Sequence, residues 1–510
     1  MKRQDLPRAL LLLGMALMIP CYLFTVGNVL VAPFELYGRS RRLLFLLTAL
    51  CAGGLLLLLR WLDGREAFFA RHERAVLACA AAFYFVAQLA MGAAMRYVPI
   101  TDTEQCFAAA QLLTDTGTFG NTYRYWEYFT RCPHNLGLVY LLSAMFRLCG
   151  MLGWADRYMQ AVLLNTLLFV PGLLCAARVC RRVGGVKAQT RVLALFATCL
   201  PMLYATTELY TDAFGLSFPL IIVYLAMRVR EAASRGECAL FGVLFALTSF
   251  VGTQIRLTSV IAVIACGIWL LLACAPRRTL PLILLTLCAF AAGGRLVDGE
   301  NERHLTREAI EQRALPILHY IAMGLPVQVD EGYGQYGDGR WLAYTMSFDD
   351  PAERDEALRQ QVIDRVYYLR YPNRLLHMMS RKNLSTFGDG AFGLGAMIAA
   401  DEKEPDNLVK RFVFYTGDLY GVYYHLCTAL FLAQQLLACL SCAQAIRRRE
   451  PSGAPLFIGL LGAFLFLCIW ETQPRYFFQY QPMLLCAAAL LCARKDESTC
   501  PGDGRTEKMA

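Results

Sequence analysis

Long apolar segments recur along this chain and constrain its fold more than any other feature. Each is about 17–25 residues long, the length that an α-helix needs to cross the hydrocarbon core of a bilayer. The composition agrees, because 57% of the 510 residues are hydrophobic and only 17% are charged, too few polar groups for the surface of a water-soluble protein. We therefore predict an all-α polytopic membrane protein with about twelve transmembrane helices. The predicted spans are residues 9–32, 43–62, 75–97, 157–179, 190–209, 213–229, 239–255, 257–275, 279–297, 420–446, 454–471 and 475–493.

Arginine and lysine residues collect in alternate loops between these spans, with one exception, the short outer loop that contains Arg39, Arg41 and Arg42. Cytoplasmic loops are enriched in these residues, so the pattern predicts a multi-pass cell-membrane protein whose N- and C-termini are both cytoplasmic. The net charge of +9 then reflects topology, and no nucleic-acid partner is expected, because no stripe of basic and aromatic residues occurs. The predicted inner loops contain Arg60, Arg65, Arg71, Arg74, Arg178, Arg181, Arg182, Lys187, Arg191, Arg228, Arg230, Arg235, Arg277, Arg278, Arg447, Arg448, Arg449, Arg494 and Lys495.

One further apolar segment, residues 134–150, does not fit this pattern as a crossing. A crossing here would place the basic loop 178–191 outside and would invert the orientation of most loops that follow. We therefore predict that this segment forms a juxtamembrane helix in the outer leaflet.

The spans and the polar segments between them predict five regions. The longest polar segment, residues 298–419, exceeds the length of a bare loop and should fold as a helical cap with one helix from Pro351 to Tyr368. The regions are an N-terminal helical hairpin at 1–74, a transmembrane core at 75–297 with its first outer loop at 98–156, the extracytoplasmic cap at 298–419, C-terminal transmembrane helices at 420–493, and a disordered cytoplasmic tail at 494–510.

An acidic tetrapeptide, Thr101-Asp102-Thr103-Glu104, stands where the third span meets water. Thr-x-x-Glu is the pattern of a capping box, so Thr101 is expected to cap a helix and Glu104 to complete the box. Asp102 would then lie in the first helical turn, where the helix dipole favours its ionised form. Such a carboxylate could take a proton from a hydroxyl or hold a divalent cation, so Asp102 and Glu104 are the two catalytic candidates. The structural and the catalytic roles are compatible with each other.

Three further candidates follow in the same outer loop. Glu127 lies among aromatic residues, which could form an interfacial belt or a platform for stacking a sugar. His134 and Asn135 follow Pro133, so they could simply begin a helix or could form a polar edge that faces a substrate head group. A lone histidine is not evidence for zinc.

Other ionisable residues lie at the predicted outer ends of spans. Asp212, Arg256, Glu471 and Arg475, with Tyr476 beside the last, are functional candidates, because charged groups near membrane depth are costly to keep there. Interfacial snorkelling is the alternative explanation, above all for Arg256. If these groups converge on one outer face, they could bind an anionic lipid head group by charge-assisted hydrogen bonds.

Most of the 20 cysteines lie inside apolar segments, where they act as small hydrophobic residues. Cys106 and Cys132 share the first outer loop and could form a disulfide. The placement of the other cysteines does not suggest a disulfide scaffold, so we expect both to be free thiols.

The motifs of this chain resemble those of the GT-C membrane glycosyltransferases, in particular bacterial relatives of protein O-mannosyltransferases and aminoarabinose transferases. The segment Tyr128-Phe129-Thr130-Arg131-Cys132-Pro133-His134-Asn135-Leu136-Gly137 is similar to the Tyr-Phe…Pro-Asn-Asn-Leu-Gly pattern of bacterial members, with His134 in place of the first Asn. The segments His319 to Leu325 and Gln473 to Tyr476 are also similar. The resemblance implies a GT-C-like bundle, a catalytic carboxylate at Asp102 and a polyprenyl-phosphate sugar as the donor. The loop departs from the family by having Asp-Thr-Glu rather than an adjacent acidic pair.

The first functional hypothesis is therefore a glycosyltransferase that acts on an extracytoplasmic acceptor at the surface of the lipid bilayer. Asp102 would deprotonate or orient the acceptor hydroxyl, and Arg475, with Arg256 or Lys382, would stabilise the lipid-phosphate leaving group. A transporter or flippase of lipid-linked glycans is the alternative, which predicts buried charges at mid-membrane and related halves of the chain. A non-catalytic membrane scaffold is a weaker third hypothesis.

Overall fold

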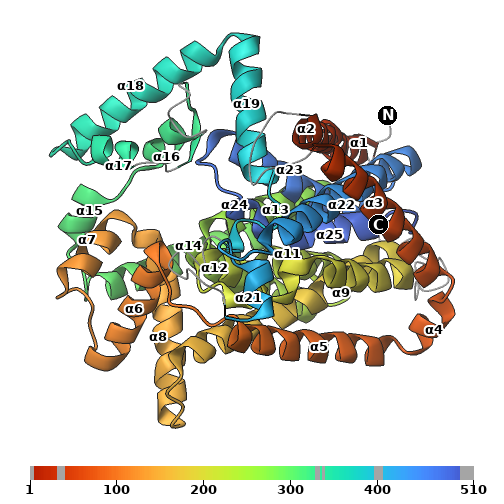
Figure 1. Ribbon diagram of the computed structural model, residues 1–510, viewed down its shortest axis with the longest axis horizontal. Coiled ribbons are helices and arrows are strands. Elements are labelled where there is room, and N and C mark those ends of the chain that lie inside the picture. The colour runs from red at the N-terminus through yellow and green to blue at the C-terminus, as the bar shows by residue number, and fades with distance from the viewer. Residues whose placement is uncertain (1–4, 32–40, 328–333, 336–338, 396–405, 494–510) are drawn as a thin grey trace.

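The computed structural model describes residues 5–31, 41–327, 334–335, 339–395 and 406–493. All regular secondary structure in these residues is helical, and Figure 1 shows most of the long helices running in a common direction through one body. This confirms the predicted fold class, an all-α polytopic membrane protein.

Among the described residues, nine helices are long and apolar enough to cross a membrane. Their order along the chain matches the predicted spans, with three differences. The predicted spans 157–179 and 190–209 lie in one element, 257–275 is the shorter helix α13 (Val260–Ala273), and 475–493 is broken into α24 (Arg475–Phe478) and α25 (Gln481–Ala489). The nine are α1–α2 (Asp5–Ala16 and Met18–Val31), α3 (Arg41–Asp63), α5 (Glu73–Ala94), α9 (Arg157–Thr198), α10–α11 (Thr211–Phe214 and Phe218–Glu231), α12 (Arg235–Ile255), α14 (Pro276–Asn301), α22 (Tyr420–Arg448) and α23 (Ala454–Ile469) with the turn before it.

The long element α9 folds back on itself at Gly184-Gly185. Gly185 has a φ of 74°, a left-handed conformation that glycine adopts without steric cost. The rings of Phe169 and Phe196 are only 6.4 Å apart, whereas a straight helix would separate them by about 40 Å. Both rings also pack against Tyr84 of α5. Two antiparallel segments are therefore present, as the sequence predicted, with a tight turn between them.

The two ends of the bundle carry different charged residues. At one end, Glu73 at the start of α5 pairs with Arg178 at 2.6 Å and Arg181 at 3.5 Å. Arg191 pairs with Asp63 at the same end. The cations of several predicted inner loops are thus gathered at one end by acidic partners. The other end of α5 leads to the acidic tetrapeptide, so this loop lies across the bundle from the basic cluster.

Three short helices cover the end of the bundle that carries the tetrapeptide: α6 (Thr101–Thr116), α7 (Tyr123–Arg131) and α8 (Leu136–Met151). Phe146 of α8 packs on Phe107 of α6 with ring centroids 5.5 Å apart. Figure 1 shows that α8 runs crosswise to α5. With 16 residues, α8 is about 24 Å long and too short for a 30 Å hydrocarbon core. It has the form of the predicted juxtamembrane helix.

The polar region 298–419 contains a further group of helices at this same end (Figure 1). The helix predicted from Pro351 to Tyr368 is present as α18. The predicted cytoplasmic tail lies outside the described residues, and so do residues 328–333 and 336–338 of this region. The helices are α15 (Arg307–Arg313), α16 (Ile317–Gly324), α17 (Arg340–Thr345), α18 (Pro351–Leu369), α19 (Pro372–Phe387) and α21 (Leu408–Val413).

Candidate active site

The first turn of α6 carries Asp102, as the sequence predicted, but its capping differs from the prediction. Thr101 is the first helical residue rather than the N-cap, and its φ of 50° is unusual for a β-branched residue. The N-cap residue is Ile100, whose apolar side chain forms no capping hydrogen bond. The Glu104 amide donates to the carbonyl oxygen of Ile100 at 3.1 Å. The predicted capping box is therefore wrong, because the Glu104 amide, which was expected to donate to the Thr101 side chain, donates to the backbone carbonyl of Ile100 instead.

The Asp102 carboxylate is held from two sides and remains 38% exposed. The Tyr128 hydroxyl donates to its Oδ1 at 3.0 Å, and Arg475 Nη2 lies 3.6 Å from its Oδ2. Behind Tyr128, the Asn135 amide donates to the tyrosine oxygen at 2.8 Å and accepts from the Tyr210 hydroxyl at 3.3 Å. A chain of hydrogen bonds thus fixes Asp102 while one face of the carboxylate stays accessible.

A buried carboxylate aligns two arginines beside Asp102. Asp212 is fully buried; Arg256 Nη2 lies 2.6 Å from its Oδ1, and Arg475 Nε lies 3.7 Å from its Oδ2. Arg256 also donates to the Thr211 hydroxyl at 3.1 Å, and its guanidinium lies 5.0 Å from the ring centre of Tyr476. The two guanidinium groups are therefore oriented before any ligand arrives.

Short and interrupted elements bring these side chains together. Asp212 lies on the four-residue helix α10, Arg256 follows the end of α12, and Arg475 begins α24. Gly215 stands where the three segments meet, since a Cβ there would lie 2.7 Å from that of Arg256. Gln479 ties the junction by donating to the Gly215 carbonyl at 3.1 Å.

Sequence reasoning missed one acidic residue of this site. Glu208 is buried, and its Oε2 accepts from the Ala213 amide at 3.1 Å at the start of α10. Its Oε1 has no hydrogen-bond partner among the described residues. The available signal is spacing, because Glu208 precedes Asp212 by four residues. The predicted span 190–209 contains Glu208 near its end, so apolar length alone does not single it out.

Glu471 and His134 border the arginine pair. Burial raises the pKa of Glu471 to about 7, against a lowering effect of its hydrogen bond with Tyr476. Burial and the nearby Arg256 lower the pKa of His134 to about 4, so its imidazole is neutral at pH 7. The His134 ring meets the edge of Tyr320 with centroids 6.4 Å apart. The site thus combines the two fixed arginine cations with Glu471, which is partly protonated near pH 7, and His134, which is neutral there.

Two sequence candidates face away from this centre. Glu104 pairs with Arg124 at 2.7 Å on the exposed side of α6. Glu127 Oε1 lies 3.7 Å from Arg313 Nη2, which joins α7 to α15. Both contacts link surface helices to each other.

Lys382, which was expected to help stabilise the lipid phosphate, instead binds backbone carbonyl groups. It is buried on α19, and its Nζ donates to the carbonyl oxygens of Gly324 and, at 2.6 Å, Trp470. Burial lowers its pKa to about 7. The lysine ties three segments together, and one of them is the loop that carries Glu471.

The described residues contain no cluster of three or more His, Cys, Asp or Glu side chains placed to hold a metal ion. Cys106 and Cys132 are free thiols, as expected, and burial raises the pKa of Cys132 to about 12.

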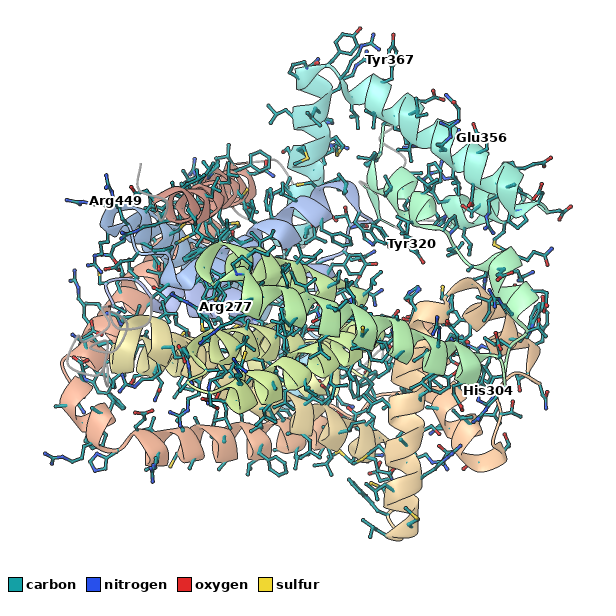
Figure 2. All side chains as sticks on the ribbon, turned by 180° about the vertical axis from the view of Figure 1, so that it is seen from behind. Arg277, His304, Tyr320, Glu356, Tyr367 and Arg449 are labelled. Carbon is teal, nitrogen blue, oxygen red and sulfur yellow. The ribbon has the colours of Figure 1, made fainter. Side chains whose placement is uncertain are left out.

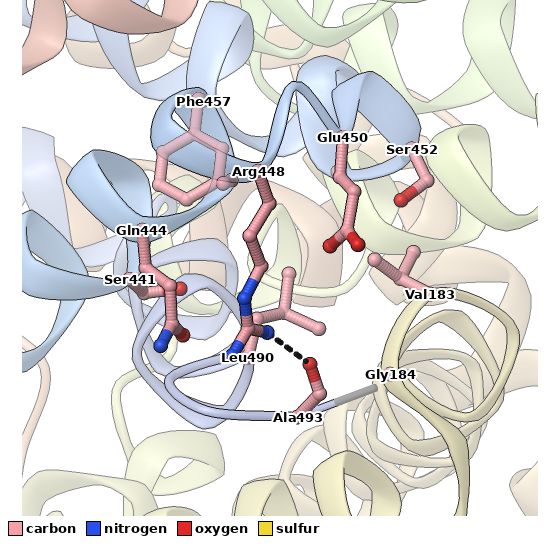
Figure 3. A pocket seen from close by; sticks show the side chains of 12 residues that line it. Val183, Gly184, Ser441, Gln444, Arg448, Glu450, Ser452, Phe457, Leu490 and Ala493 are labelled. Carbon is pink, nitrogen blue, oxygen red and sulfur yellow. Dashed lines mark hydrogen bonds between the residues drawn. The ribbon is translucent and has the colours of Figure 1, made fainter. Parts of the chain in front are cut away.

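A pocket at the opposite end of the bundle, shown in Figure 3, contains none of the candidate residues. Its lining includes Arg448, which donates to the Ala493 carbonyl at 3.2 Å.

Comparisons with known proteins identify the family of this chain. A search of curated proteins finds no match. Two solved structures of ArnT from Cupriavidus metallidurans are similar at 14% identity and a TM-score of 0.37 for the apo state, and at 15% and 0.39 for the state bound to undecaprenyl phosphate. The alignments cover 83% and 82% of this chain and 78% of each ArnT chain. A family model described as "Conserved hypothetical integral membrane protein" matches residues 40–495, and the chain therefore belongs to this family of integral membrane proteins.

Proposed function

We propose that this protein is a membrane glycosyltransferase that moves a sugar from a polyprenyl-phosphate donor to an acceptor hydroxyl. One observation carries the proposal: the accessible Asp102 carboxylate lies 3.6 Å from the guanidinium of Arg475. A base for the acceptor and a cation for the leaving phosphate are thus neighbours. The motif resemblance to GT-C enzymes supports the same chemistry.

In the proposed reaction, Asp102 acts as the general base. The acceptor oxygen attacks C1 of the donor sugar while its proton passes to the carboxylate. The bond between C1 and the phosphate oxygen breaks, and its electron pair leaves with the lipid phosphate. The hydrogen bond from Tyr128 to Oδ1 would keep the carboxylate in one orientation during this transfer.

The leaving phosphate would be stabilised by Arg475 and Arg256. Both guanidinium groups are anchored by the buried Asp212, so they need little reorganisation as negative charge develops. Because His134 is neutral at pH 7, the positive charge beside the phosphate would come from the two arginines. On the predicted topology the site faces the extracytoplasmic side, where the acceptor would be a cell-envelope glycan, lipid or protein.

One observation favours a transporter or flippase of lipid-linked glycans as a second candidate. The segments that carry Asp212 and Arg475 are interrupted helices, with Asp212 fully buried and the Arg475 side chain 12% exposed; interrupted helices with charged groups are common at transporter binding sites. The two functions differ in outcome: an enzyme makes a new glycosidic bond, and a transporter moves an intact molecule.

The test uses purified full-length protein in lipid vesicles with donors that carry a labelled sugar on polyprenyl phosphate. We expect covalent transfer of label by the native protein and a loss of about 10²–10⁴-fold in Asp102→Asn. Glu104→Gln is the matched control, because this acid lies in the same helical turn but pairs with Arg124. Movement of intact donor across the bilayer without a new bond would favour the transporter instead.

A further inference from the structure

The turn between α18 and α19 has one face packed on the protein and one face without a partner. On the packed face, Arg365 donates to the Leu325 carbonyl at 2.8 Å and lies over the Trp341 ring. On the other face, residues 370–377 are all exposed. Figure 2 shows Tyr367 at this turn, pointing away from the body. The exposed face is therefore free for an external partner.

This exposed face carries a patch of tyrosines and arginines, Tyr367, Tyr368, Arg370, Tyr371 and Arg374. The Arg370 guanidinium lies 3.4 Å from the ring centre of Tyr367, and that of Arg374 lies 4.1 Å from Tyr368. Neither arginine forms an ion pair within the part of the chain that the structure describes. Tyr367 is 66% exposed. The tyrosine–arginine patch thus presents uncompensated positive charge on an aromatic surface.

The position of α19 places this patch at the membrane surface. The amide of Asn28, one turn before the end of the first span, donates to the Ser380 carbonyl at 2.7 Å. The second half of α19 is therefore level with the end of a membrane span. Figures 1 and 2 show α19 running crosswise to the bundle, with the α18–α19 turn projecting beyond its side. In a bilayer that surrounds these spans, the turn would lie over lipid rather than over the bundle.

We propose that the tyrosine–arginine patch binds the head groups of anionic phospholipids and anchors α18 and α19 to the membrane surface. Tyrosine rings favour the membrane–water interface, and arginine forms charge-assisted hydrogen bonds with phosphate. Leu376, which is 60% exposed on the first turns of α19, would insert among the acyl chains. This anchor is independent of the proposed transfer reaction, and it makes the position of these helices depend on lipid charge.

The experiment measures hydrogen–deuterium exchange of residues 366–377 in the full-length protein. The protein is placed in nanodiscs of phosphatidylcholine, with or without phosphatidylglycerol. Each arginine near an anionic surface favours docking about fivefold, so two favour it up to about 30-fold. We expect slower exchange with phosphatidylglycerol, loss of that difference in the double variant Arg370→Gln and Arg374→Gln, and weakening at high salt.

Arg359→Gln is the matched control, because this arginine is exposed on α18 but pairs with Glu356 away from the turn. Unchanged exchange in α5 and α22 checks that each variant is folded. Equal exchange in the two lipids would overturn the proposal, and so would a lipid effect that survives loss of both arginines. Protection in phosphatidylcholine by a soluble anionic polysaccharide alone would overturn it in favour of a glycan site.

Discussion

Asp212→Asn should destabilise the protein more than any exposed acidic substitution. The Asp212 carboxylate is fully buried and holds Arg256 at 2.6 Å and Arg475 at 3.7 Å. Removing one charge from a buried ion pair leaves its partners uncompensated, at a cost of about 3–5 kcal/mol. Asparagine keeps the size and one acceptor oxygen, so we expect a loss of about 3 kcal/mol in the free energy of unfolding.

The assay is a double-mutant cycle with Arg256→Gln, followed by titration with a denaturing detergent in mixed micelles. The double variant should lose about 2 kcal/mol less than the sum of the single variants, because the second substitution removes the uncompensated partner. Asp115→Asn is the matched control: its pair with Arg157 is exposed and worth about 0–1 kcal/mol. Additive losses, or a loss in Asp212→Asn no larger than that of the control, would refute the buried-pair argument.

Two further predictions follow from the surroundings of this pair. Burial raises the pKa of Glu471 from 4.5 to about 7, so the folded state favours the protonated acid; its contribution to stability is complete below about pH 4.5 and is lost as the pH rises through 7. Glu471→Gln should therefore flatten the pH dependence of the unfolding free energy, and an unchanged slope would contradict the assignment. Gly215→Ala should displace Arg256, whose Cβ would lie 2.7 Å from the new methyl group, and should lower both stability and transfer activity. Gly150→Ala, with open space around it, should leave both nearly unchanged; equal behaviour of the two alanine variants would argue against a crowded junction.

The helical fold was predictable because apolar length is a local property of the sequence. The turn at Gly184-Gly185 lies inside the predicted basic loop 178–191, because the end of one apolar segment and the start of the next are also local features of the sequence. The last predicted span, 475–493, is continuous in composition but broken between Phe478 and Gln481, just before Pro482, which has no amide to continue the helix. Arg475 at its start pairs with Asp212 on a distant segment. Such long-range pairing leaves no periodic signal in a single sequence.

The candidate site was predictable in part. Ionisable residues at span ends are conspicuous in an apolar chain, and the structure brings Asp102, Asp212, Arg256 and Arg475 together. Their partners were not predictable. Lys382 bonds to backbone carbonyls of Gly324 and Trp470, and a sequence carries no information about which carbonyls a lysine will reach.

Thr101 shows that a local sequence pattern can also fail to predict the conformation of its own residues. Its sequence pattern matches a capping box, yet the N-cap position falls on Ile100, and the φ of 50° at Thr101 lies outside the right-handed helical region. The adjacent Asp102 contacts Tyr128 and Arg475 from distant segments, and a local capping pattern contains no information about such contacts.

The central claim is that Asp102 acts in the chemical step and Arg475 in holding the phosphate. The most direct measurement compares sugar transfer and binding of the polyprenyl-phosphate donor for Asp102→Asn and Arg475→Gln in lipid. We predict that Asp102→Asn loses transfer by about 10²–10⁴-fold while it still binds donor, and that Arg475→Gln loses donor binding. Full turnover by Asp102→Asn would contradict the account.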